Sequence, residues 1–110
     1  MAIQEQLQGL VSKFNRKMEE DEEVRKEVSP LRKTFNFDLG DETYSFRLEN
    51  AMISDFKPEM VREADVVVTC SAEDFRKILD GDLRPMRAFV TKKIRIEGKI
   101  QDLMFLKKFL

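Results

Sequence analysis

The stretch ADVVVTCSAEDFRKILDG, residues 64–81, carries the strongest structural signal in this chain. Its first half is a run of β-branched and apolar side chains that ends at Cys70. Because the run is apolar on both faces, it predicts a central strand that is buried on both sides. Ser71 follows at once and can cap a helix, and Asp74 stands at the position that answers it in a capping box. Gly81 stands where the end of a helix favours a positive φ angle. The stretch therefore predicts a strand that passes directly into a helix. The buried edge of this helix would be formed by its apolar residues, which are Phe75, Ile78 and Leu79.

A second short helix, a strand and a final helix are predicted after this stretch. Pro85 suits the first position of a helix, because its φ angle is preset and that position needs no N–H donor. The large apolar residues of this helix are expected to face inward, and they are Met86, Phe89 and Val90. Residues 93–97 alternate between polar and apolar, with the two isoleucines on the inner face, and Gly98 ends the strand. Residues 103–110 predict a helix that is apolar on most sides.

Upstream, the period of the apolar residues indicates a β-hairpin. Residues 35–39 and 44–48 each alternate between apolar and polar side chains, as half-buried strands do. Gly40-Asp41 lies between them, and a two-residue loop with glycine first suits a type II′ turn. A three-residue loop would pair aromatic with polar residues, whereas the two-residue loop pairs aromatic residues with one another. The resulting pairs are Phe37 with Tyr44 and Phe35 with Phe46. A weaker third strand is predicted over 51–56, and residues 57–60 are expected to open a connection with a helical turn.

The N-terminal segment is predicted to be helical. Apolar residues recur at three-and-four spacing from Ile3 to Met18 and line one helical face. The acidic run at 19–23 interrupts this stripe, which resumes at Val24 and stops before Pro30. The pattern leaves two alternatives open: one long helix with a polar middle, or two helices.

The order of the predicted elements defines the fold class. A helix precedes three strands, and a connection, a strand, two short helices, a strand and a final helix follow. Strands and helices do not alternate strictly, so the class is α+β rather than doubly wound α/β. The chain has 110 residues and a mass of 13.0 kDa, with 42% hydrophobic and 37% charged residues. This is the size of one compact domain, so residues 1–110 are expected to form a single domain.

The composition excludes several classes of chemistry. The chain has no histidine, which removes the Ser-His-Asp and Cys-His nucleophile systems and the commonest metal ligand. Cys70, the single cysteine, ends an apolar strand and is interpreted as a small buried hydrophobic residue. The sequence holds no calcium loop and no glycine-rich phosphate loop, so no metal and no cofactor is expected. A pair of carboxylates acting as acid and base is left open, because such a pair forms in space rather than in sequence.

Charge and targeting signals limit which partners and which cellular location are expected. No apolar run approaches the roughly 20 residues of a membrane span, and the N-terminus has no signal-peptide pattern. Together with the single cysteine this predicts a cytoplasmic protein. The net charge of −1 makes nucleic acid an unexpected partner, yet the charge is uneven. Residues 84–110 carry eight basic and two acidic side chains, a net charge of +6, against −7 for residues 1–83. This basic end either favours an anionic head group or membrane surface, or is merely solvated or turned toward the acidic part.

Residues 64–98 resemble the sterol-carrier-protein-2 (SCP2) sterol-transfer family. The resemblance rests on an ordered set of short motifs: a strand led by Asp65, then Ser71-x-x-Asp74-Phe75-x-x-Ile78-Leu79-x-Gly81, then Pro85, Ala88-Phe89, Lys93-Ile94-Arg95-Ile96 and Gly98. Each motif alone is a helix cap, a turn or a core position, so the specificity lies in their order and spacing. Three departures stand out: Lys92-Lys93 where many relatives have Gly-Lys, Lys99 where they have Asn or Asp, and an end without the peroxisomal Ser-Lys-Leu tripeptide.

The resemblance implies a mixed five-stranded sheet with helices over one face and an apolar tunnel between the layers. It also implies a carrier for sterols, fatty acids, fatty acyl-CoA or phospholipids, with no catalytic residue and no cofactor. Without the peroxisomal tripeptide, a bacterial or archaeal cytoplasm is expected. Since many such organisms make no sterol, an acyl chain with an anionic head is the expected ligand.

Two functions are therefore hypothesised. In the first, the chain is a non-enzymatic carrier that holds a lipid in its cavity and touches membrane surfaces transiently. The side chains expected to line the cavity come from the hairpin and from the last three helices: Phe35, Phe37, Tyr44, Phe46, Phe75, Ile78, Met86, Phe89, Met104, Phe105 and Phe109. Three cations are expected to meet the head group, namely Arg87, Lys92 and Lys99. In the second, side chains fill the cavity, and the protein is an accessory module for a lipid or quinone biosynthetic enzyme, with a homodimer through the final helix.

Overall fold

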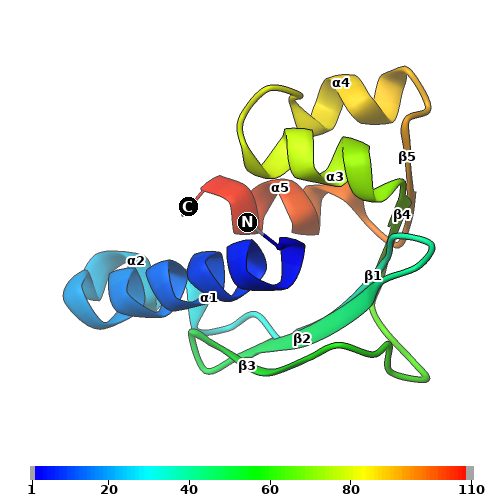
Figure 1. The fold of residues 1–110 in the computed structure, drawn as a ribbon. Coiled ribbons are helices and arrows are strands. Elements are labelled where there is room, and N and C mark those ends of the chain that lie inside the picture. Colours follow the sequence, from blue (N-terminus) through cyan, green and yellow to red (C-terminus); the bar gives the residue numbers. More distant parts are fainter. Residues whose placement is uncertain (1, 109–110) are drawn as a thin grey trace.

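The structure, a computed structural model, describes residues 2–108, with side chains as far as residue 105. The described residues form five helices and five strands in the order that the sequence predicts (Figure 1). In chain order they are α1 (Ile3–Glu20), α2 (Glu22–Val28), β1 (Lys33–Asp38), β2 (Thr43–Glu49), β3 (Met52–Lys57), β4 (Val66–Cys70), α3 (Ala72–Leu79), α4 (Pro85–Val90), β5 (Ile94–Glu97) and α5 (Ile100–Lys108).

The strands form one mixed sheet in the order β3-β2-β1-β4-β5. β1 and β4 run parallel, and the other neighbouring strands are antiparallel. Figure 1 shows the helices gathered on one side of this sheet. The α+β class, with helices over one face of a mixed five-stranded sheet, is therefore confirmed.

The predicted hairpin and its register are confirmed. Leu39 N–H donates to the carbonyl of Glu42 at 2.9 Å, and Gly40 between them has a φ of +87°. Since the loop holds two residues, β1 and β2 pair aromatic residues with one another. The pairs are Phe37 with Tyr44 and Phe35 with Phe46. These side chains are all buried, so the hairpin turns one aromatic face toward the helices.

The N-terminal segment forms two helices rather than one. Asp21 adopts an extended conformation between α1 and α2, and its side chain accepts a hydrogen bond from the N–H of Val24 at 3.2 Å. The acidic residue that breaks the apolar stripe is thus the cap of the second helix, because a carboxylate satisfies N–H groups that the helix cannot pair itself. Phe14 and Met18 are buried on α1 just before this break, as the stripe predicts.

The strand and helix that follow the connection match their prediction closely. Ser71 caps α3 by accepting from the N–H of Asp74 at 3.0 Å, and Gly81 ends the helix with a φ of +83°. On β4, alternate residues are buried against the helices, whereas Val67 and Thr69 are only half-buried on the other face. The expectation of a strand covered on both faces is therefore wrong in part, because no helix covers that second face in the described chain.

Two further expectations are corrected. Residues 58–65 take no helical turn; Asn36 holds this connection instead, donating to the carbonyl of Val61 and accepting from its N–H, both at 2.9 Å. On α4, Pro85 and Ala88 are the buried residues. The large residues expected to face inward point outward, with exposed fractions of 45% for Met86, 39% for Phe89 and 70% for Val90. A six-residue helix at the edge of the fold buries only one side, and the small side chains allow the closest approach.

Candidate functional site

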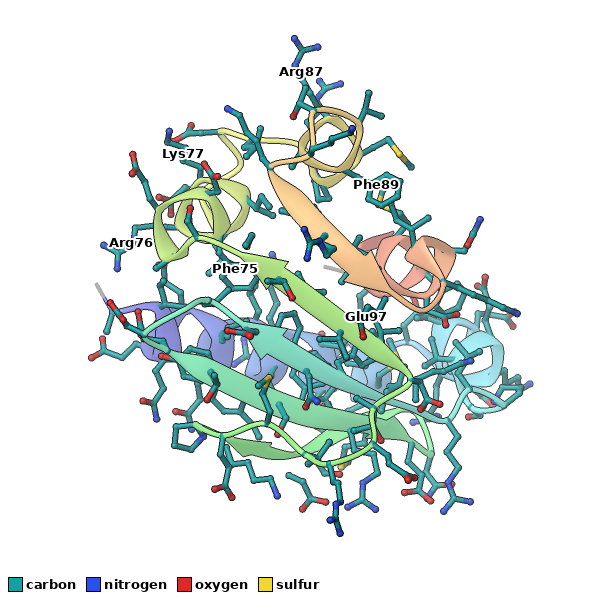
Figure 2. All side chains as sticks on the ribbon, turned by 90° about the vertical axis from the view of Figure 1, so that its right-hand side faces the viewer. Phe75, Arg76, Lys77, Arg87, Phe89 and Glu97 are labelled. Atoms are coloured by element: carbon teal, nitrogen blue, oxygen red, sulfur yellow. The ribbon has the colours of Figure 1, made fainter. Side chains whose placement is uncertain are left out.

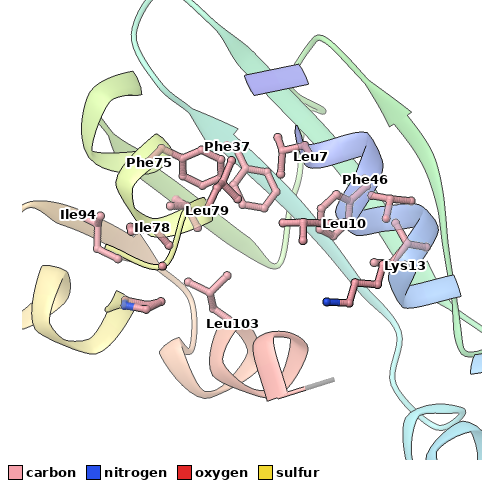
Figure 3. A pocket seen from close by; sticks show the side chains of 15 residues that line it. Leu7, Leu10, Lys13, Phe37, Phe46, Phe75, Ile78, Leu79, Ile94 and Leu103 are labelled. Carbon is pink, nitrogen blue, oxygen red and sulfur yellow. The ribbon is translucent and has the colours of Figure 1, made fainter. Parts of the chain in front are cut away.

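A cavity of about 340 Å³ lies between the sheet and the helices and is partly open to solvent (Figure 3). Its volume is at the lower end of the roughly 300–1,000 Å³ typical of small-molecule sites, and its lining is almost wholly apolar. The 15 lining residues come from helices and strands throughout the fold. In chain order they are Leu7, Leu10, Val11, Lys13, Phe37, Phe46, Ile53, Val68, Phe75, Ile78, Leu79, Gly81, Pro85, Ile94 and Leu103.

Three phenylalanine rings form an aromatic wall of this cavity. The centroid of the Phe37 ring lies 5.3 Å from that of Phe46 and 5.6 Å from that of Phe75, in tilted arrangements. Such offset contacts between buried rings are favourable and hold each ring in place. Phe37 and Phe46 face the cavity only because the two-residue turn sets the hairpin register, so the turn at Gly40-Asp41 positions part of this wall.

Helices close the cavity on its other sides. Leu7, Leu10 and Val11 recur at the three-and-four spacing of one α1 face, and this face is turned toward the sheet. Leu103 reaches the cavity from α5 (Figure 3). An ion pair of 3.4 Å between Lys33 and Asp102 ties the start of α5 to the first strand.

Lys13 is the one charged side chain among the described lining residues. Figure 3 shows its amine at the α1 end of the cavity, away from Ile94. It forms no hydrogen bond and no ion pair with any described residue, although it stands beside an apolar surface. A cation in this position would attract the anionic end of an amphipathic molecule whose apolar part fills the cavity.

The structure brings four of the predicted cavity residues together in the lining: Phe37, Phe46, Phe75 and Ile78. Phe35 and Tyr44 lie in the core beside it. The Phe35 ring packs 5.3 Å from Phe46, and Tyr44 stacks on Phe56 and donates to a carboxylate oxygen of Glu42 at 2.5 Å.

The other predicted site residues lie apart from the lining. Met86 and Phe89 are on the outer side of α4, and Met104 and Phe105 are half-buried on α5. Phe109 lies outside the described residues. The three head-group candidates are exposed and line no part of the cavity, namely Arg87, Lys92 and Lys99. Their contact with a ligand stays a prediction.

The residues that α1 contributes to the cavity lining were all missed by sequence reasoning. Leu7, Leu10 and Val11 were assigned to the buried stripe of a helix, and that stripe was the signal that could have identified them as lining residues. Lys13 had no such signal, because a lysine between apolar helix positions is ordinarily solvated. Its position becomes visible only once α1 is placed over the sheet.

Two buried side chains among the described residues have strongly raised pKa values. Burial and, to a smaller extent, the nearby Asp74 carboxylate raise the pKa of the Cys70 thiol to about 12, so the nucleophilic thiolate is disfavoured. Burial and then the Glu42 carboxylate raise the pKa of Tyr44 to about 12. No three His, Cys, Asp or Glu side chains within the described chain come together as metal ligands, and no described helix is long and apolar enough to cross a membrane.

A second hollow, of about 450 Å³, lies on the opposite face of the sheet. Its lining is polar, and the Arg47 guanidinium there pairs with the carboxylates of Asp55 and Glu49. Basic and acidic side chains occur in this hollow in equal numbers, so they largely compensate one another. The apolar cavity is therefore the better candidate for a binding site.

Comparison with known proteins assigns the family. The fold and the apolar cavity between its layers define a small α+β protein built around a ligand-sized space. A model of the SCP-2 sterol transfer family matches residues 12–110, so the chain belongs to this family. Among curated proteins, none matches the sequence.

Solved structures with a similar fold include carriers and parts of larger chains. A double mutant of the sec-alkyl sulfatase PisA1 from Pseudomonas sp. has a TM-score of 0.69 at 17% identity; the match covers 78% of this chain but only 14% of the sulfatase. Sterol carrier protein 2 has a TM-score of 0.62 at 20% identity, over 92% of this chain and 87% of that one. The ubiquinone synthesis protein UbiJ-SCP2 has a TM-score of 0.64 at 15% identity, over 99% and 92%. At these identities the likeness concerns the fold.

Proposed function

We propose that this protein is a non-enzymatic lipid carrier that holds one amphipathic molecule in the cavity between its sheet and helices. The observation that carries the proposal is the cavity itself, about 340 Å³ in volume and lined by apolar side chains from both layers. Membership of a sterol transfer family supports a lipid as the ligand. Burying an acyl chain there would be driven by its removal from water, worth about 0.8 kcal/mol per CH₂.

The ligand class we favour is a fatty acid or another single acyl chain with an anionic head. The modest volume suits one chain better than two, and Lys13 offers a cation at the α1 end of the cavity. The chain would lie against the phenylalanine wall, and its head would meet the Lys13 amine. Arg87, Lys92 and Lys99 remain proposed contacts only for a head group that extends beyond the cavity.

The non-enzymatic part of the proposal rests on the side chains present. The sequence has no histidine, and the single thiol is held protonated in the core. We place the carrier in the cytoplasm, because its only cysteine is free and buried.

The decisive experiment is native mass spectrometry combined with ligand titration. Protein purified from its host should carry a lipid-sized adduct, or should take up dodecanoate or hexadecanoate after delipidation. Leu10→Trp, which fills the cavity, should abolish uptake. The matched control Gln8→Trp adds the same ring to the exposed side of the same helix and should leave uptake intact. A protein that stays empty against a panel of fatty acids, phospholipids and sterols would overturn the proposal.

A second candidate function is an accessory module for a lipid or quinone biosynthetic enzyme. Two similarities favour it: the ubiquinone synthesis protein shares the fold over nearly the whole chain, and in the sulfatase the fold is one part of a much larger chain. This function predicts co-elution with an enzyme and no lipid uptake. A homodimer through α5 belongs to the same candidate, and the mass of the protein in solution tests it.

A further inference from the structure

The outer side of α4 combines exposed apolar side chains with unpaired cations. Met86, Phe89 and Val90 follow a helical spacing of three and four, so they share one arc of the helix, and all three are exposed. Pro85 and Ala88 occupy the buried side of the same helix. The exposed arc is therefore a consequence of how α4 packs and does not arise from a loosely held segment.

Basic side chains surround this arc. They are Arg84 before the helix, Arg87 within it, and Lys92 and Lys93 after it, and all are exposed. Figure 2 shows Arg87 reaching outward from α4, with Phe89 on another side of the helix. None of the four pairs with a carboxylate among the described residues, and the sequence contains no Asp or Glu from residue 83 to residue 96. The four charges are thus uncompensated on the surface.

We propose that the outer face of α4 docks the protein on an anionic lipid bilayer, with Met86, Phe89 and Val90 entering the interface while Arg84, Arg87, Lys92 and Lys93 meet the head groups. Apolar side chains ringed by cations are the pattern that anionic membrane surfaces bind, since burial of apolar area and attraction to the lipid charge act together. An acidic protein would use the cations but would leave this apolar arc without a partner of its own.

The position of α4 relates this surface to the cavity. Pro85, the first residue of α4, lines the cavity, and Met86, the next residue, is exposed on the docking face. The same short helix therefore forms a wall of the cavity on one side and the docking face on the other. Docking would bring that wall against the bilayer, where a lipid is taken up or released. The docking itself does not depend on the cavity binding a lipid.

The experiment is co-sedimentation with vesicles of phosphatidylcholine alone or with about one third phosphatidylserine, at roughly 0.1 M and about 0.5 M salt. We expect the protein to bind the anionic vesicles, and we expect high salt to suppress this binding. Arg84→Gln with Lys93→Gln should weaken it about 25-fold, at about fivefold per cation. Phe89→Ser with Val90→Ser should weaken it by about tenfold or more, through the lost apolar contact.

The matched control is Met60→Ser with Arg62→Gln, in the connection between β3 and β4. Both side chains are exposed, and Figures 1 and 2 show this connection at the opposite end of the molecule from α4. This variant should bind vesicles as the parent does. Circular dichroism and dodecanoate titration should be unchanged in every variant, which separates loss of docking from loss of the fold or of the cavity ligand.

Three results would overturn the proposal. The first is equal binding to neutral and anionic vesicles. The second is a loss in the control as large as that in the α4 variants. The third is binding to a polyglutamate peptide without binding to any vesicle, which would assign the face to an acidic protein instead.

Discussion

At the scale of single residues, Gly98 has a backbone position that no other residue type can occupy without strain. Its φ is +100°, and a Cβ there would collide with the carbonyl oxygen of Asp65. Gly81 also has a positive φ, of +83°, but has open space around the position of its missing Cβ. Comparing a substitution at Gly81 with one at Gly98 therefore distinguishes the cost of backbone strain from the cost of a steric clash.

We predict that Gly98→Ala lowers the free energy of unfolding by about 3 kcal/mol, whereas Gly81→Ala lowers it by about 1 kcal/mol. Both lose the conformational freedom of glycine, but only the first also forces the start of β4 away from Gly98. Urea unfolding of the two variants measures the difference. Equal losses would show that the backbone near Asp65 moves aside without cost.

The raised pKa values of Cys70 and Tyr44 predict a loss of stability at alkaline pH. The pKa of each is raised to about 12 in the folded protein, from 9.0 for the thiol and 10.0 for the phenol. Below about pH 8 both groups are protonated whether the chain is folded or not, so neither affects stability. Above it the unfolded chain releases protons that the folded chain keeps, so the free energy of unfolding falls as the pH rises toward 12.

Urea unfolding at about pH 8 and pH 11 measures this loss, which we expect to be about 4 kcal/mol. The variant with Cys70→Ala and Tyr44→Phe has neither group and should show a clearly smaller dependence over the same range. Parallel curves for the variant and the parent protein would contradict the assignment.

At the scale of helices and strands, side-chain caps define where two of the helices begin. Ser71 caps α3 and Asp21 caps α2, each accepting from the N–H three residues on. α3 carries Phe75, Ile78 and Leu79 into the cavity lining, so its first turn also positions part of the site.

We predict that Ser71→Ala lowers the free energy of unfolding by about 1 kcal/mol, because the N–H of Asp74 loses its partner. Ser71→Asp keeps an acceptor at the same position and should retain most of that stability. Thermal unfolding of the two variants compares them. A Ser71→Asp variant as unstable as Ser71→Ala would mean that the side-chain hydrogen bond is not what stabilises α3.

The hairpin and α4 show what could and could not be predicted from the sequence. Alternation and a two-residue turn sufficed for the hairpin register, because a slip by one residue would expose every aromatic side chain. The orientation of α4 was predicted wrongly, since its six residues are apolar on most sides and periodicity alone cannot select the buried one. Tertiary packing made that selection, placing Pro85 and Ala88 inside.

At the scale of the whole molecule, the cavity is a property of the packed layers. No segment of the sequence contains it, because its lining combines α1, all five strands and the last three helices. The resemblance to the family predicted that a space would exist between the layers, and the residues around it followed only in part. Lys13 illustrates the limit: it is one of 20 basic side chains, and nothing local distinguishes it from the others.

The whole structure also shows where the uneven charge of the sequence lies. The sequence showed a net charge of +6 after residue 83, but could not say whether acidic side chains cover it. In the structure, the cations around α4 are exposed and without carboxylate partners among the described residues. The uneven charge is therefore concentrated beside the exposed apolar arc, which is the arrangement from which docking follows.

Ligand binding should stabilise the whole fold if the cavity is the site. A molecule that binds only the folded chain raises the free energy of unfolding by about 2.7 kcal/mol at a hundred times its Kd. For a domain of this length that corresponds to a rise in Tm of roughly 10 °C or more. We predict such a rise with dodecanoate for the parent protein and for Gln8→Trp, and no rise for Leu10→Trp.

The same rise in Tm, measured on a Lys13 variant, tests whether this lysine recognises the head group of the ligand. Lys13→Met keeps a long side chain but removes the charge, so the rise in Tm with dodecanoate should shrink while the smaller rise with dodecanol stays the same. Lys17→Met, on the same helix but outside the lining, is the control and should respond as the parent does. If Lys13→Met lost the response to both compounds, the lysine would act on the cavity as a whole rather than on the carboxylate. If it lost neither, the anionic head would have to meet another cation, and Arg87, Lys92 and Lys99 would be the next residues to replace.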